Sequence, residues 1–181
     1  MLTPSRHHGG VALFYWESPV FAVEAIHQFG LNVIACHLET GGGRWYIVGC
    51  YLAPGYGATF WDVEAVIAER PNGTELIVAE DLNVDLERTS RRGQDEEIAA
   101  AVSTGGVEDL LVHFLQHQIA WNRDWRMWAM VRQGREVRSW TDYILGSNFW
   151  IFQNVAVWDL RHNSDHYIFL GCLQGAFTRE Q

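Results

Sequence analysis

The sequence has little charge, little proline and no long apolar run. Only 19% of its 181 residues are charged and 4 are proline, whereas 48% are hydrophobic and 9 are tryptophan. Intrinsically disordered chains have the opposite composition, with much charge and few aromatic residues, so we expect most of this chain to fold. Its length is that of one domain with a sizeable core. We predict a single domain over residues 1–181.

Membrane and secretion signals are also missing from the sequence. No window approaches the roughly 18 consecutive apolar residues of a membrane span. Residues 1–8 lack the apolar segment of a signal peptide. We therefore predict an intracellular protein, for which the nucleus is one location that fits, with no membrane partner.

Cysteine and positive charge are both scarce. The cysteines, Cys36, Cys50 and Cys172, each lie in an apolar run without the close spacings of zinc ligands, so we predict buried thiols and no disulfide. The formal net charge is -9. The molecule as a whole does not attract a phosphate backbone at this charge, so a nucleic-acid role requires a local binding site.

Short apolar runs bounded by turn residues recur along the chain and predict β-strands. Glycine-containing loops at 41–43 and 133–134 each separate two such runs, which is typical of hairpins. Strands outnumber helices without strict alternation, which favours packed mixed sheets with helices outside, an α/β (α+β) fold. The predicted strands are 11–16, 32–38, 45–51, 75–79, 127–132, 136–139, 141–145, 149–157 and 167–173, and the predicted helices are 59–69, 95–102 and 107–115.

Polar residues stand at the ends of several of these runs. Asp81 and Asn83 follow the run 76–79, and the two-residue period of a strand places both side chains on one side. An Asx turn that caps the strand is the alternative. Asp142 opens another run and Tyr51 closes a third. These groups can meet only if the strand ends share one rim.

A histidine beside an acid precedes the last predicted strand, in Ser164-Asp165-His166. Histidine can act as a general acid or base near neutral pH, and the acid can bind a metal. A solvated loop before a strand is the alternative for these residues.

Taken together and in this order, the motifs resemble the endonuclease/exonuclease/phosphatase superfamily, whose fold is a DNase-like four-layer α/β/β/α sandwich. Within that superfamily, residues 48–54 and 138–145 are most similar to the endonuclease domain of non-LTR retrotransposons. The resemblance covers about residues 9–172. The motifs that carry it are Tyr51 with Pro54, Asp81-Leu82-Asn83, Ser139 with Asp142-Tyr143, and Ser164-Asp165-His166.

The resemblance implies a role for each matched residue in the reaction. Asp81 would activate or orient the attacking water, and Asn83 and Tyr51 would contact the scissile phosphate. Asp142 would orient His166, whose imidazole would stabilise the charge that builds on the phosphate in the transition state.

The resemblance also implies a cofactor and a partner. Asp165 and Asn83 would bind a divalent cation, Mg²⁺ or Mn²⁺, for the hydrolysis of DNA phosphodiesters. The family's opening strands, with an asparagine and a metal-binding glutamate, have no match, so we expect the fold to lack them. Glu17 and Glu39 are the candidates to replace that glutamate.

Three functions therefore stay open from the sequence. The first is metal-dependent hydrolysis of DNA by a retrotransposon-type endonuclease domain, with activity reduced by the missing glutamate. The second is an inactive fragment that binds nucleic acid or a protein partner at most. The third is a phosphatase or phosphodiesterase of the same fold that acts on a small phosphorylated molecule.

Overall fold

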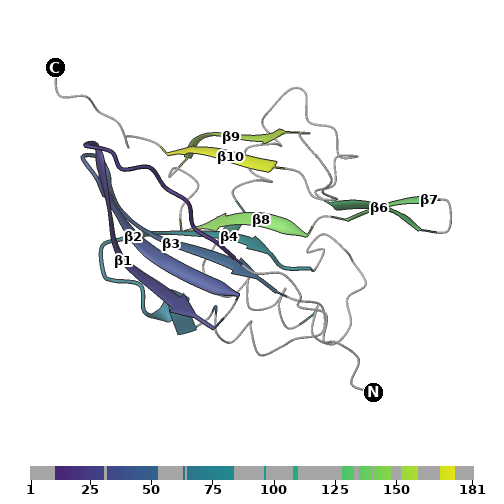
Figure 1. Cartoon of the computed structure of the whole chain (residues 1–181), viewed down its shortest axis with the longest axis horizontal. Helices are drawn as coiled ribbons and strands as arrows, with labels where there is room; N and C mark the ends of the chain where they lie inside the picture. The colour runs from purple at the N-terminus through teal and green to yellow at the C-terminus, as the bar shows by residue number, and fades with distance from the viewer. Residues whose placement is uncertain are drawn as a thin grey trace.

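The structure is a computed structural model, and its β-strands form three sheets (Figure 1). It describes residues 11–30, 32–52, 63, 65–83, 96, 108–109, 128–132, 135–139, 141–147, 152–158 and 168–173. The largest sheet has the order β1-β2-β3-β4-β8-β5, and β10 pairs with β9 and β6 with β7. The strands are β1 (Phe21–Phe29), β2 (Val33–Thr40), β3 (Gly43–Tyr51), β4 (Glu75–Asp81), β5 (Glu108–Asp109), β6 (Trp128–Arg132), β7 (Arg135–Ser139), β8 (Asp142–Gly146), β9 (Phe152–Trp158) and β10 (Ile168–Leu173).

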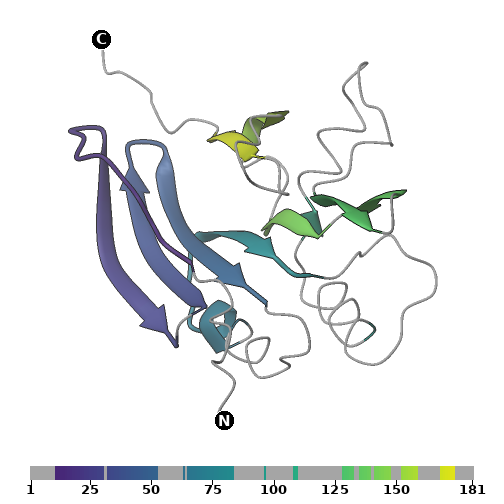
Figure 2. The same cartoon turned by 45° about the vertical axis from the view of Figure 1, so that its right-hand side comes forward.

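The connection between β3 and β4 gives the largest sheet its mixed character. These two strands run parallel, whereas the other strand pairs of the sheet are antiparallel. Figure 2 shows β2 and β3 side by side between β1 and β4. Residues 63 and 65–68 of the crossover are helical, in agreement with the predicted helix 59–69. A parallel pair needs such a crossover, and it brings the carboxyl ends of β3 and β4 to the same edge.

Buried residues lie on both faces of this sheet, and one face carries most of them. On this face the buried residues alternate along β2, β3, β4 and β8. Val63 and Val66 of the crossover are buried as well. Each fully buried aliphatic side chain contributes about 1.5–3 kcal/mol of transfer free energy. The buried residues that alternate along the strands are Val33, Ala35, Tyr46, Val48, Cys50, Leu76, Val78, Tyr143 and Leu145.

The opposite face is covered in part by the segment that precedes β1. Val11 and Leu13 line a cavity of about 190 Å³ together with Ile34, Ile47 and other residues of β2 to β4. A methyl group at Gly49 would meet the Cγ2 atom of Val11 at 3.1 Å, so the segment lies directly over this glycine. Glycine at this position therefore lets the chain approach the sheet closely.

Most predicted strands are confirmed, but the first one is wrong. Residues 11–17 form no strand, and in Figure 1 this segment crosses the sheet instead of pairing with it. The first strand is β1, in which Glu24, His27 and Gln28 interrupt the apolar pattern. Val11 and Leu13 face the sheet, whereas Phe14, Tyr15 and Trp16 are exposed, so the apolar composition of this run does not indicate a strand.

The helix predicted over residues 107–115 is also wrong at its start. Glu108–Asp109 form β5 and pair with β8, opposite Gly146 and Leu145. Pairing with a free strand edge outweighs a local helical period, because propensity is a weak preference that tertiary contacts override. In the predicted helix 95–102, Glu96 is helical. Within the described ranges, no helix is long and apolar enough to cross a membrane.

Two of the three predicted thiols are confirmed, because Cys36 and Cys50 are buried and form no disulfide. The side chain of Cys172 lies outside the described part of the chain. Burial raises the pKa of the Cys36 thiol above its ordinary value of 9.0. Burial, the Glu69 carboxylate and Cys36 together raise the pKa of the Tyr46 phenol above 10.0. Both groups are therefore held neutral in the folded protein.

These two shifts predict a loss of stability at alkaline pH. A raised pKa in the folded state stabilises the protein below the unfolded pKa, and the contribution disappears as pH rises through the folded pKa. We expect the free energy of unfolding, measured in urea, to fall above a pH of about 9. The fall should be smaller in Cys36→Ala and Tyr46→Phe, and an unchanged fall in both variants would contradict the assignment.

A serine fixes the register of β4 against β8. The Ser147 hydroxyl donates to the Glu75 carboxylate, and its Oγ accepts the Leu76 backbone N–H at 3.0 Å. The Ser147 backbone N–H donates to the Leu76 carbonyl at 3.1 Å. Because the pairing is antiparallel, this fastening at one end determines which residues meet at the other end of the two strands.

Replacement of Ser147 by alanine tests this fastening. We expect Ser147→Ala to lower the free energy of unfolding by about 1–2 kcal/mol, because two hydrogen bonds are lost at a half-buried position. Urea unfolding is the measurement. Ser18→Ala is the matched control, since the Ser18 hydroxyl accepts only an exposed turn N–H from Val20 at 3.3 Å. Equal losses of unfolding free energy in the two variants would show that the hydrogen bonds of Ser147 stabilise the fold no more than an exposed turn does.

Candidate active site

Three polar residues lie side by side at one edge of the largest sheet. Tyr51, the last residue of β3, pairs in register with Asp81, the last of β4, and Asp81 pairs with Asp142, the first of β8. Residues paired in this way point to the same face, on strands about 4.7–4.9 Å apart. We call Tyr51, Asp81 and Asp142 the rim row. The shared rim expected from the sequence is confirmed for these strand ends.

The rim row continues into backbone that is still ordered by hydrogen bonds. The Leu52 N–H donates to the Asp81 carbonyl at 2.8 Å, and the Leu82 N–H donates to the Thr141 carbonyl at 2.8 Å. Leu52 and Leu82 are each 2% exposed, so their side chains anchor the chain just beyond the strand ends. The rim row therefore belongs to rigid sheet rather than to a mobile loop, which suits a site that must hold a fixed geometry.

Asn83 turns back onto Asp81. Its backbone N–H donates to Asp81 Oδ1 at 3.0 Å, and its Nδ2 donates to Asp81 Oδ2 at 3.2 Å and to the Leu52 carbonyl at 2.8 Å. Asn83 has φ 52, in the left-handed region that asparagine tolerates. It has left the strand, so this turn rather than strand alternation brings it to Asp81.

The bond from the Asn83 N–H to Asp81 is the Asx turn that the sequence offered as the alternative. The turn and a catalytic role are compatible, because the turn fixes the Asp81 carboxylate in place. Both partners of Asn83 Nδ2 are acceptors, which determines the orientation of the amide. The amide oxygen Oδ1 therefore points away from Leu52 and Asp81 and remains the group through which Asn83 can meet a cation.

Asp142 is held by its neighbour. The Thr141 hydroxyl donates to Asp142 Oδ2 at 3.3 Å, and Thr141 is 8% exposed. Asp81 and Asp142, directly opposite each other, are two acids in one cross-strand pair. Like charges in such a pair repel, so this part of the rim row favours a bound cation or a positively charged side chain. Thr141 was not among the predicted site residues. The signal that could have identified it is a hydroxyl side chain immediately before a buried strand.

His166 and Asp165 lie outside the described residues. Their place at the rim and their roles therefore stay predictions. The strand that follows them, β10, begins at Ile168 and pairs with β9.

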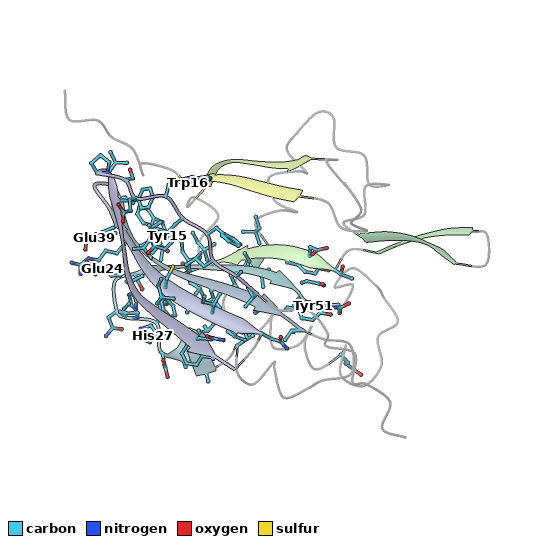
Figure 3. All side chains as sticks on the ribbon, in the orientation of Figure 1. Tyr15, Trp16, Glu24, His27, Glu39 and Tyr51 are labelled. Carbon is cyan, nitrogen blue, oxygen red and sulfur yellow. The ribbon has the colours of Figure 1, made fainter. Side chains whose placement is uncertain are left out.

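The two acids suggested as replacements for the metal-binding glutamate lie at the wrong end of the sheet. Glu39 pairs with Arg44, which is seven residues before Tyr51 along β3, a distance of roughly 23 Å. Figure 3 shows Glu39 and Tyr51 at opposite ends of the sheet. Glu17 precedes β1, whose first residue Phe21 pairs with Thr40 at the same far end. Neither acid can replace the glutamate at the rim row, so that hypothesis is wrong.

The oxygen atoms at the rim row fit a magnesium ion. Mg²⁺ prefers hard oxygen ligands and commonly uses one or two carboxylates together with substrate phosphates. Asp81 and Asp142 offer two carboxylates, and Asn83 offers an amide oxygen. Among the side chains that the structure describes, no three from His, Cys, Asp and Glu gather into a metal site. The described residues therefore suit an ion shared with a phosphate rather than a closed protein cage.

Comparison with known proteins identifies the fold. No family model and no curated protein matches the chain. The endonuclease domain of TRAS1, a telomere-specific non-LTR retrotransposon, matches with a TM-score of 0.59 at 14% identity, over 79% of this chain and 64% of that chain.

Two further solved structures match over similar lengths. An endonuclease/exonuclease/phosphatase family protein from Leptotrichia buccalis matches with a TM-score of 0.58 at 13% identity, over 78% of this chain and 53% of that chain. TDP2 from D. rerio, complexed with a single-strand DNA product, matches with a TM-score of 0.53 at 16% identity, over 82% of this chain and 66% of that chain.

The chain thus spans about half to two thirds of the length of these structures. At such identities the likeness concerns the fold. The mixed sheet and the arrangement that it shares with these structures lead to one conclusion. The chain has the DNase-like α/β fold of the endonuclease/exonuclease/phosphatase proteins, as its motifs predicted.

Proposed function

We propose that this chain hydrolyses phosphodiester bonds in DNA and uses Mg²⁺ or Mn²⁺ to do so. The observation that carries the proposal is the rim row, in which Tyr51, Asp81 and Asp142 stand in register on three adjacent strands. The fold adds support, because its solved members include a retrotransposon endonuclease domain and a TDP2 bound to a single-strand DNA product.

Asp81 is the residue that activates water in this proposal. A carboxylate can orient a water molecule and accept its proton as the water attacks the phosphorus atom. The two bonds from Asn83 hold both carboxylate oxygens at a fixed angle. Asn83 acts first as a positioning residue for Asp81, because its amide hydrogens are taken by Asp81 and Leu52. This differs from the direct phosphate contact that the resemblance implied.

Tyr51 and Asp142 flank Asp81 and receive the substrate. In this proposal the Tyr51 hydroxyl donates a hydrogen bond to a phosphate oxygen, and Asp142 would orient the His166 imidazole toward the same phosphate. A cation bound with Asn83 and Asp165 would act as a Lewis acid on the phosphate. It would also reduce the repulsion between an acidic protein and a polyanion.

Hydrolysis of two small substrates tests the proposal. The diester bis(p-nitrophenyl) phosphate is compared with the monoester p-nitrophenyl phosphate. Each substrate is incubated with protein in Mg²⁺, in Mn²⁺, in EDTA and without added metal, and with buffer alone. We expect metal-dependent cleavage that favours the diester. A preference for the monoester would instead indicate a phosphatase of the same fold, and no cleavage of either by folded protein would contradict an enzymatic function.

A further inference from the structure

Thr141 is a buried polar residue beside the rim row. It is 8% exposed, and its hydroxyl donates to Asp142 Oδ2 at 3.3 Å. Its carbonyl accepts the Leu82 N–H at 2.8 Å, so its backbone is fixed against the chain that follows Asp81. Thr141 is therefore connected with both acids of the rim row, one through its side chain and the other through the neighbouring backbone.

Burial of a hydroxyl at this position lowers the stability of the fold unless the hydroxyl forms a hydrogen bond. Valine has the same shape, fits the start of a buried strand, and requires no hydrogen bond. The hydroxyl of Thr141 finds its acceptor in a carboxylate, and hydrogen bonds to charged groups are stronger than bonds between neutral groups. At 3.3 Å the bond is long for two oxygen atoms. A bond of this length adds little to the stability of the sheet.

The bond makes the two oxygen atoms of Asp142 inequivalent. Oδ2 is turned toward Thr141, so the plane of the carboxylate is set and Oδ1 has a defined direction. Asp142 is half-buried and stands opposite Asp81. A rotation of its carboxylate would therefore change the distance between the two negative charges. A small change in this angle alters the position of any group that Asp142 holds.

We propose that Thr141 is a positioning residue, whose hydroxyl sets the orientation of the Asp142 carboxylate for hydrolysis. The kinetic consequence rests on the proposed function, whereas the orientation itself does not. The test compares Thr141→Val, which removes the hydroxyl and keeps the shape, with Thr141→Ser, which keeps the hydroxyl. Thr74→Val is the matched control, because the Thr74 hydroxyl donates to the Pro71 carbonyl at 2.7 Å, away from the rim row.

Two measurements on the full chain separate the two parts of this inference. The first is the ¹³C chemical shift of the Asp142 carboxyl carbon at neutral pH, assigned with Asp142→Asn. We expect this shift to change in Thr141→Val and to stay at the wild-type value in Thr141→Ser and Thr74→Val. An unchanged shift in Thr141→Val would overturn the inference, whether or not the protein cleaves DNA. If Thr141→Val fails to fold, Thr141→Ala takes its place in the same comparison.

The second measurement is the steady-state hydrolysis of the diester. We expect kcat to fall about tenfold in Thr141→Val with KM nearly unchanged, and to be restored in Thr141→Ser. A change in KM alone, or equal loss in both variants, would contradict a positioning role. If wild-type protein shows no hydrolysis, the proposed function fails, and the carbon shift still decides whether Thr141 orients Asp142.

Discussion

Replacement of Asp81 by asparagine is expected to lower the rate of diester hydrolysis by about 10²–10⁴-fold. Asparagine has the size of aspartate but cannot accept a proton from water, so the variant removes the general base while it keeps the fold. KM should change little, since Asp81 acts on the water rather than on the body of the substrate. The measurement is the initial rate of hydrolysis at saturating Mg²⁺.

The control for this variant is Glu24→Gln. Glu24 is exposed on β1, near the end of the sheet opposite Tyr51, and the substitution removes the same charge (Figure 3). We expect the Glu24→Gln protein to keep wild-type activity. Comparable losses in both variants would show that the overall charge, and not the Asp81 carboxylate, determines the rate.

Replacement of Asn83 by glycine is expected to lower the rate by about 10²-fold, because it releases the Asp81 carboxylate and the Leu52 carbonyl together. Glycine adopts the left-handed φ of Asn83 without strain, so the variant removes the side chain and leaves the turn. Alanine would confuse the two effects, since it costs roughly 1–2 kcal/mol in this conformation. The same diester assay gives the rate.

Asn72→Gly is the matched control for the Asn83 variant. Asn72 is exposed in the turn before β4, at the other end of that strand. Its loss should leave the rate unchanged. If Asn83→Gly also keeps the wild-type rate, the hydrogen bonds to Asp81 and Leu52 have no part in catalysis.

The strands that carry the site could be predicted because their sequences are unambiguous. The cores of β3 and β4, residues 45–50 and 76–79, are apolar runs, so both strands are predicted from the sequence, although β4 continues two residues past its predicted end and includes Asp81. Polar residues at these ends indicate a shared rim once the strands are neighbours. The pairing of β4 with β8, which brings Asp142 opposite Asp81, depends on contacts distant in sequence and was not predicted.

Other features could not be predicted from local patterns. The apolar run 11–16 forms no strand: Val11 lies over Gly49, and Phe14, Tyr15 and Trp16 are exposed, which its apolar composition does not reveal. Asn83 reaches Asp81 through a left-handed turn, which strand periodicity does not describe. The hydroxyl of Thr141 gains its role only from the carboxylate beside it.

The central claim is that the rim row catalyses metal-dependent cleavage of DNA, and nicking of supercoiled plasmid tests it most directly. Purified protein is incubated with plasmid in Mg²⁺ or in EDTA, beside Asp81→Asn and Glu24→Gln. We expect nicked circles with wild-type protein and Glu24→Gln in Mg²⁺, and none with EDTA or with Asp81→Asn. Intact plasmid with folded wild-type protein in Mg²⁺, or nicking by Asp81→Asn at the wild-type rate, would contradict the central claim.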